Sequence, residues 1–186
     1  MQDNIQNTIN ALKKGGVILH KTDTIWGLAC DADNEKAIEK IIKIKKRPAD
    51  KSFILLISDI TQLNIYVEKI PDIAWDIVEF AEKPLTVIYP KGKNLPLSVL
   101  ASDGSIAIRV VKDKTCRDLI YKFGKAIVST SANISGEKTP INFNEIKQEI
   151  KDEVDFIEQL VGQESISEPS TIVQLGLNGD FKFIRK

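Results

Sequence analysis

The 186-residue sequence has few of the residues that bind metals, form disulfides or act as catalytic bases. It contains two cysteines, Cys30 and Cys116, and one histidine, His20. The cysteines lie far apart and form no C-x-x-C pair, so the pattern indicates neither a zinc site nor a structural disulfide and is typical of buried thiols. A single histidine leaves a Ser-His-Asp triad only one candidate base, and its place at the end of a predicted strand favours a structural role.

Long apolar runs and an excess of one charge are also missing. No run approaches the length of about 20 residues that a membrane-spanning helix needs, and residues 1–10 lack the basic and apolar regions of a signal peptide. Lys and Arg together number 26, the same as Asp and Glu, which argues against a protein with a broadly basic, nucleic-acid-binding surface. We therefore expect a cytoplasmic protein without membrane contact.

Internal repeats, low-complexity tracts and a Pro/Gly/Ser-rich linker are missing as well. Hydrophobic residues make up 42% of the chain, and a single core can serve a chain of up to about 250 residues. We predict one domain over residues 1–186, with the polar stretch 162–170 as a surface loop within it.

Helical and strand patterns alternate along the chain. Apolar residues at three- and four-residue spacing predict helices around residues 5–12, 37–42, 73–78, 116–123 and 145–151. Short apolar runs predict strands at 17–19, 53–57, 85–89, 106–111, 126–129, 171–175 and 181–184. The alternation indicates an α/β domain with helices flanking a sheet. Because the last two runs read as an antiparallel hairpin, we expect the sheet to be mixed.

Two polar segments near the amino terminus are candidates for chemistry. Residues 22–28 (TDTIWGL) follow a buried strand, where ligand-binding loops of α/β sheets lie. Taken alone, they fit an ordinary turn better, with Trp26 in the core. The second is a cationic cluster at a helix end, which consists of Lys43, Lys45, Lys46, Arg47 and Lys51. Such a cluster usually complements the helix dipole and is solvated. Here Pro48 stops the helix and directs Arg47, whose guanidinium suits two-pronged contacts with anions.

Two further segments lie in the carboxyl-terminal half. Residues 129–136 (STSANISG) are dense in small donors, and fit a polar turn and a phosphate-wrapping loop equally well. Arg109 lies in the apolar strand pattern 106–111, where a charge needs either an ion-pair partner or a function. Ser170, just before another strand, carries almost no information by itself.

Five motifs occur together in order: KTDTIWGL, K-x-R-P at 45–48, DGSIAIRV, STSANISG and PSTIV. In this combination the sequence resembles the YrdC-like family of threonylcarbamoyl-AMP synthases over nearly its whole length. The pairing of K-x-R with a later S-x-N is that family's signature. The order and spacing of the five motifs make the resemblance specific, although each motif is short.

The resemblance implies a single α/β domain with an open, twisted mixed sheet, flanking helices and a concave, positively lined cavity. It implies contacts with threonine by Thr24, Arg109, Ser129 and Ser170. It implies contacts with ATP by Arg47, Lys51, Ser105, Ser131, Thr139 and Arg185. Lys45, Arg47 and Asn133 are the catalytic residues that it implies. Leu56 stands where some relatives have a threonine-contacting histidine, so we expect that contact to be absent.

The implied reaction condenses L-threonine, bicarbonate or CO2, and ATP into threonylcarbamoyl-AMP and pyrophosphate, for threonylcarbamoyladenosine modification of tRNA. Cations and hydroxyl donors suit it, because they bring anionic reactants together and offset developing charge. No covalent nucleophile is needed. Mg²⁺ is expected to bind chiefly through ATP phosphates and water, and we predict no metal site built from protein side chains.

Two alternatives remain at this point. The chain could be a double-stranded RNA-binding module of the same fold, or a paralogue that acts on another carbamoyl or acyl substrate. The absence of net charge and of aromatic residues within the basic cluster argues against the first. For the synthase, the resemblance implies contact with tRNA and downstream proteins that transfer the threonylcarbamoyl group.

Overall fold

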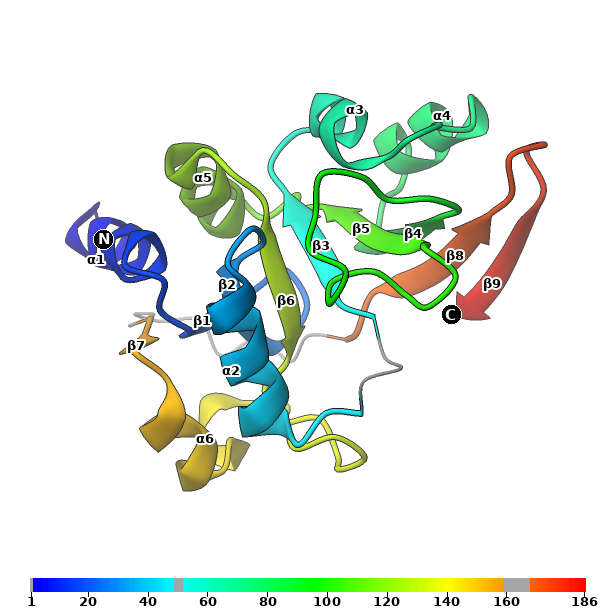
Figure 1. The fold of residues 1–186 in the computed structure, drawn as a ribbon. Helices are drawn as coiled ribbons and strands as arrows, with labels where there is room; N and C mark the ends of the chain where they lie inside the picture. Colours follow the sequence, from blue (N-terminus) through cyan, green and yellow to red (C-terminus); the bar gives the residue numbers. More distant parts are fainter. Residues whose placement is uncertain (1, 49–51, 159–167) are drawn as a thin grey trace.

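A nine-stranded, open mixed sheet organises the chain in the computed structural model, which describes residues 2–48, 52–158 and 168–186 (Figure 1). The strands are β1 (Ile18–Lys21), β2 (Trp26–Asp31), β3 (Ile54–Ile57), β4 (Leu85–Tyr89), β5 (Ile106–Val110), β6 (Ile127–Ser131), β7 (Phe156–Ile157), β8 (Thr171–Leu175) and β9 (Phe181–Arg185). Their spatial order is β7-β1-β2-β6-β3-β5-β4-β8-β9. The pairs β1/β7, β3/β5 and β4/β8 are parallel and the other neighbours antiparallel, which confirms the predicted mixed sheet.

The helices pack on both faces of this sheet. They are α1 (Gln2–Lys13), α2 (Glu35–Lys45), α3 (Leu63–Tyr66), α4 (Ile73–Glu79), α5 (Lys114–Phe123) and α6 (Gln148–Glu153), with short 3-10 turns at Ile60–Gln62 and Phe143–Glu145. Helices α1 and α5 share one apolar cluster with Ile18, Leu56 and Ile127 of the sheet. Helices α2, α4 and α6 share the other cluster with strand residues such as Leu55 and Val128. Neighbouring residues of one strand thus pack on opposite faces, as the strand pleat requires.

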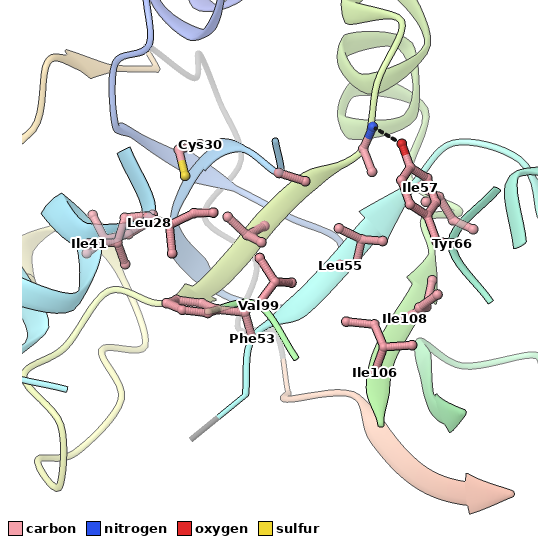
Figure 2. Packing of buried hydrophobic residues seen from close by; sticks show 14 of the residues in the cluster. Leu28, Cys30, Ile41, Phe53, Leu55, Ile57, Tyr66, Val99, Ile106 and Ile108 are labelled. Carbon is pink, nitrogen blue, oxygen red and sulfur yellow. Dashed lines mark hydrogen bonds between the residues drawn. The ribbon is translucent and has the colours of Figure 1, made fainter. Parts of the chain in front are cut away.

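Figure 2 shows part of the larger cluster, in which residues of α2, β2, β3 and β5 meet. Leu55 and Ile57 of β3 belong to this cluster with Ile106 and Ile108 of the neighbouring strand β5, whereas the Phe53 ring lies on the side of Leu28 and Ile41. The Tyr66 hydroxyl accepts a hydrogen bond from the backbone N–H of Ala126 at 3.2 Å, so this phenol at the edge of the core has a polar partner.

Most predicted elements are confirmed, and the exceptions have local reasons. Strand β2 was absent from the prediction, because its residues are buried on both faces and show no alternation of apolar and polar side chains. The two-residue strand β7 is too short for any pattern. The helix predicted at 145–151 is a 3-10 turn followed by α6. Of the predicted loop 162–170, residues 162–167 lie outside the described residues, and the single-domain prediction stays a prediction.

Helix α2 is defined at both ends by the chemistry of the residues next to it. The Asn34 side chain accepts a hydrogen bond from the Ala37 N–H at 3.1 Å and caps the amino terminus. Lys46 ends the helix in a left-handed conformation with φ of 48°, and Pro48 follows. None of the helices in the described ranges combines the length and the apolar character needed to cross a bilayer.

Candidate functional site

A cavity of about 290 Å³ lies on the sheet face that α1 and α5 cover elsewhere. Residues two apart in a strand lie on the same face of the sheet. Ile127 and Leu56 pack against these helices, and Ser129 and Ile54, each two residues away in the same strand, line the cavity. The charged lining residues are Arg47, Arg109 and Arg185. Hydroxyl groups come from Thr22, Thr24, Ser52, Ser129, Thr130, Ser131, Thr139 and Ser170, and an apolar wall from Ile25, Ile54, Ile88, Ile172 and Ile184.

The turn between β1 and β2 supplies one end of the cavity. The Thr22 hydroxyl bonds the Thr24 hydroxyl at 2.8 Å and accepts from the Thr24 and Ile25 N–H groups, so the turn is held by its own side chains. An added Cβ at Gly27 would lie 3.0 Å from both the Ser129 Oγ and the Thr130 carbonyl oxygen. Segment 22–28 is therefore both an ordinary turn and a wall of the cavity.

The end of α2 supplies a second wall. The Arg47 guanidinium lies 4.6 Å from the centre of the Phe53 ring, donates to the Ser52 carbonyl at 2.5 Å and to the Thr130 hydroxyl at 3.3 Å. These contacts hold the guanidinium at the cavity surface, as expected where the chain leaves the helix at Pro48. A planar, stacked guanidinium is well suited to phosphate or carboxylate recognition.

Lys45 differs from its neighbours in the cationic cluster, because it is only 1% exposed. Its Nζ donates to the carbonyl oxygens of Ser131 at 2.5 Å and Asn133 at 2.6 Å. The Asn133 amide in turn donates to the Ile134 and Glu137 carbonyls. Lys45 and Asn133 therefore lie behind the cavity wall and shape the loop after β6, and neither lines the cavity.

Arg109 lies on β5 in the floor of the cavity and is 4% exposed. Its Nη1 donates to the Thr24 hydroxyl at 3.0 Å, and its Nη2 lies 3.4 Å from the Asp23 Oδ1. The sequence left an ion pair or a function as the reason for this buried charge. The structure shows an acidic neighbour and also a position facing the cavity, so the two explanations are compatible. Burial lowers the pKa of Arg109, and Asp23 opposes that shift.

Arg185 reaches the cavity from β9, beside Ser170. Its Nε and Nη2 donate to the Ser170 carbonyl at 2.9 and 2.8 Å, while the Ser170 hydroxyl bonds that of the buried Thr86 at 2.8 Å. A register shift between Ile172 and Val173 interrupts the β8/β9 ladder. Beside this bulge, the consecutive residues Ile184 and Arg185 both line the cavity.

The electrostatics of the cavity favour an anion. Burial lowers the pKa of Arg185 and the nearby Arg109 lowers it further, so the two guanidinium groups repel each other. No carboxylate is among the described lining residues, although Asp23, outside the lining, partly offsets the charge of Arg109. A bound anion would relieve this repulsion, and the surrounding hydroxyl groups can donate to its oxygens.

Of the residues singled out for the site, the structure brings eight together in the cavity lining: Thr24, Arg47, Arg109, Ser129, Ser131, Thr139, Ser170 and Arg185. Lys45 and Asn133 lie behind it, and Ser105 is buried just before β5, where its N–H donates to Asp103. Lys51 lies outside the described residues. The roles of all these residues stay predictions.

The sequence prediction missed the lining residues Thr22 and Thr130 and the apolar wall. Both threonines lie within motifs already singled out, so their hydroxyls were the available signal. The sequence held no such signal for the isoleucines, because an apolar residue in a strand pattern is interpreted as part of the core. In the described ranges, no group of three or more His, Cys, Asp or Glu side chains is placed to hold a metal ion.

Residues 10–186 match the family model Sua5_yciO_yrdC, whose description is telomere recombination. A protein of Pseudoalteromonas translucida (strain TAC 125) named threonylcarbamoyl-AMP synthase is 37% identical over 175 residues, covering 92% of each chain. A protein of Wigglesworthia glossinidia brevipalpis with the same name is 34% identical over 186 residues, covering 98% of this chain and 93% of its own.

Solved structures show the same fold. E. coli YciO superposes with a TM-score of 0.85 at 26% identity, covering 100% of this chain and 90% of that one. Sua5 of P. abyssi complexed with L-threonine superposes with a TM-score of 0.81 at 25% identity, covering 92% of this chain. This chain spans only half of that Sua5 chain, 50% of its length.

Proposed function

Because the chain belongs to the Sua5_yciO_yrdC family, we propose that it is a threonylcarbamoyl-AMP synthase, which condenses L-threonine, bicarbonate or CO2, and ATP with release of pyrophosphate. The relatives that carry this name match nearly the whole chain, and a Sua5 structure of the same fold was solved with L-threonine. The observation that carries the proposal is the cavity, where three arginines and many hydroxyl groups face a space without an acidic lining residue in the described ranges.

The proposed threonine site lies at the Arg109 end of the cavity. Arg109 binds the carboxylate of threonine through the donors that Thr24 leaves unoccupied, and Ser129 and Ser170 offer hydroxyls to the polar groups of the amino acid. The amine then lies in the cavity, where it combines with CO2 to form a carbamate. The low exposure of Arg109 and Ser170 supports this assignment, because charged hydrogen bonds are stronger away from water.

The proposed ATP site lies at the Arg47 end, together with Ser131 and Thr139. Arg185, from the β8/β9 wall, is expected to reach the nucleotide from the other side, and Lys51 and Ser105 are further expected contacts. The carbamate oxygen attacks the α-phosphorus, the bond from that phosphorus to the bridging oxygen breaks, and pyrophosphate leaves. The reaction is thus a nucleotidyl transfer. In this proposal Arg47 neutralises phosphate charge, while Lys45 and Asn133 support it indirectly by fixing the loop after β6.

The described lining offers Mg²⁺ hydroxyls and no carboxylate, so the ion would be held by ATP phosphates and water, with Ser131 and Thr139 as the available protein oxygens. When bound, Mg²⁺ would neutralise phosphate charge. We also propose that the product serves tRNA modification in the cytoplasm through downstream transferase proteins.

The proposal is tested by incubating the protein with Mg²⁺, ATP, bicarbonate and single amino acids, and by measuring pyrophosphate and the acyl adenylate. We expect both products with threonine and a much lower yield with valine, which lacks the hydroxyl. Release of pyrophosphate that is independent of threonine would contradict the assignment, and would point to the paralogue with another acyl substrate. Binding of double-stranded RNA without any adenylate would point to the RNA-binding module.

A further inference from the structure

Asp23 is a buried acid that the proposed reaction leaves without a role. It lies in the turn between β1 and β2, directly before Thr24, and its side chain is 7% exposed. Neither carboxylate oxygen has a hydrogen-bonded partner of good geometry among the described residues. Its ionic neighbour is Arg109, whose Nη2 lies 3.4 Å from the Asp23 Oδ1. Burial raises the pKa of Asp23, while Arg109 and the backbone N–H of Lys112 act in the opposite direction. A buried carboxylate with so few polar contacts is unfavourable for folding, which calls for an explanation.

We propose that Asp23 is a positioning residue, which holds the Arg109 guanidinium in the orientation that presents its remaining donors to the substrate in the cavity. The proposal rests on the proposed function for the identity of that substrate, an amino-acid carboxylate. Asp23 does not line the cavity and touches no reacting atom.

The contacts of Arg109 support this role. A guanidinium carries five N–H donors in one plane. Thr24 accepts from Nη1 at 3.0 Å, Asp23 lies beside Nη2, and Nε has no hydrogen-bonded partner. Two contacts from adjacent residues of one turn thus restrict rotation of the plane. That turn is itself held by the Thr22 hydroxyl, so the orientation of Arg109 is determined before a substrate binds.

Asp23 also stabilises the charged guanidinium of Arg109. Burial lowers the pKa of Arg109, and Asp23 acts in the opposite direction. Arg185, the second guanidinium near Arg109, has no comparable acid in the described lining, and its contacts are to the Ser170 carbonyl and hydroxyl. Loss of the Asp23 charge should therefore disturb Arg109 and the threonine end of the cavity, and should leave the Arg47 end unchanged.

The test compares Asp23→Asn, Asp23→Glu and the control Asp155→Asn. Asp155 is an acid with a structural role far from the cavity, since it accepts from the Val17 N–H at 2.7 Å and pairs with Lys40 at 2.8 Å. We expect Asp23→Asn to raise the KM for threonine by about tenfold or more, with the KM for ATP changed by less than about twofold. Asp23→Glu keeps the carboxylate charge that Asp23→Asn removes, and should raise the KM for threonine by less. Asp155→Asn should lower the melting temperature without altering either KM.

A second readout does not depend on activity. In protein with ¹⁵N-labelled arginine, the Nε–H signal of Arg109, assigned by its loss in Arg109→Lys, should broaden or shift in Asp23→Asn and stay near its original position in Asp155→Asn. An unchanged Arg109 signal, or an equal rise in both KM values, would overturn the positioning role. If the wild-type protein released no threonine-dependent pyrophosphate while the signal responded as expected, only the proposed function would fail. Should Asp23→Asn not fold, Asp23→Glu carries both measurements, because its extra methylene displaces the carboxylate from Arg109.

Discussion

The polar side chains of the cavity are held by protein neighbours before any ligand binds. Thr24 is bonded by Thr22 and Arg109, Ser170 by Thr86, and Arg47 by Ser52 and Thr130. Donors fixed in advance need little reorganisation during a reaction, which is how electrostatic stabilisation becomes effective. The site therefore depends on residues that hold the ligand-facing groups as well as on those groups themselves.

Arg47 offers the most direct test of the ATP end. Arg47→Ala removes a charged, two-pronged donor and should weaken nucleotide use by about 1.5 to 3 kcal/mol. Steady-state kinetics with ATP as the varied substrate measure the effect. Lys43→Ala is the matched control, because Lys43 is an exposed lysine of the same helix end that does not line the cavity. A KM for ATP that responds equally in the two variants would contradict a specific role for Arg47.

His20 is fully buried, and neither ring nitrogen has a hydrogen-bonded partner in the described residues. Burial, and secondarily Arg109, lowers its pKa from 6.5 to about 4. The unfolded chain then binds a proton between these values that the folded chain does not, so this residue's contribution to stability falls as pH decreases from 6.5 to 4. We predict that His20→Phe becomes more stable relative to wild type by roughly 2 kcal/mol between pH 7 and pH 5, measured by urea unfolding.

Glu158 changes the stability of the protein with pH in the opposite direction to His20, so each variant has to be compared with the wild type. Burial raises its pKa from 4.5 to about 7, so the folded state binds the extra proton and this contribution to stability rises as pH decreases from 7 to 4.5. The two contributions oppose each other in the wild-type protein. Glu158→Gln should therefore shift relative to wild type in the opposite direction to His20→Phe, and a shared direction would contradict both assignments.

At the scale of elements, α2 connects the fold to the site. Its amino terminus is capped by Asn34, and its last residue, Lys45, holds the loop after β6 through two carbonyl oxygens. The β8/β9 hairpin has a similar role at the opposite end of the cavity, because its bulge brings both Ile184 and Arg185 to the lining. One wall of the cavity thus depends on where α2 ends, and the other on the bulge in the β8/β9 hairpin.

The contribution of the Asn34 cap to the stability of α2 can be tested. Asn34→Ala removes the hydrogen bond to the Ala37 N–H and should lower the free energy of unfolding by about 1 kcal/mol. Asn7→Ala, at an exposed position inside α1, makes the same chemical change without a cap and should be neutral or slightly stabilising. Urea unfolding of the two variants measures the difference, and equal stabilities would show that the cap contributes nothing.

At the scale of the whole molecule, the site spans the sheet from β2 to β9, so a ligand contacts segments that are distant in sequence. A ligand that binds only the folded state stabilises it by about 2.7 kcal/mol at 100 times its Kd. We predict that saturating Mg²⁺ and ATP raise the melting temperature by roughly 5 to 10 °C, a shift typical for a chain of this size. Scanning calorimetry checks this. The same nucleotide concentration should shift Arg47→Ala less, and an unchanged melting temperature in the wild type would contradict binding at this cavity.

Local patterns in the sequence determined most of the elements. Apolar periodicity predicted α1, α2, α4 and α5 and all strands except β2 and β7, because it reports directly which face of a segment is buried. Pro48 marked the end of α2 because proline cannot continue a helix. The motifs, together with the family resemblance, also indicated most of the polar side chains of the lining, because each motif is short enough to lie on one wall.

Tertiary structure alone decided which members of a motif face the ligand. Lys45 and Arg47 are two residues apart in one cationic cluster, yet the first is buried against Ser131 and Asn133 and the second lines the cavity. A side-chain hydrogen bond joins Arg109 of β5 to Thr24 across 85 positions of sequence, and Asp23 lies beside that contact. Apolar periodicity predicts which side chains of a segment are buried. The partner of a buried charge depends on strand order and register, which periodicity does not report. For that physical reason, the sequence predicted an anion-binding chemistry, and only the fold showed how its charges are oriented.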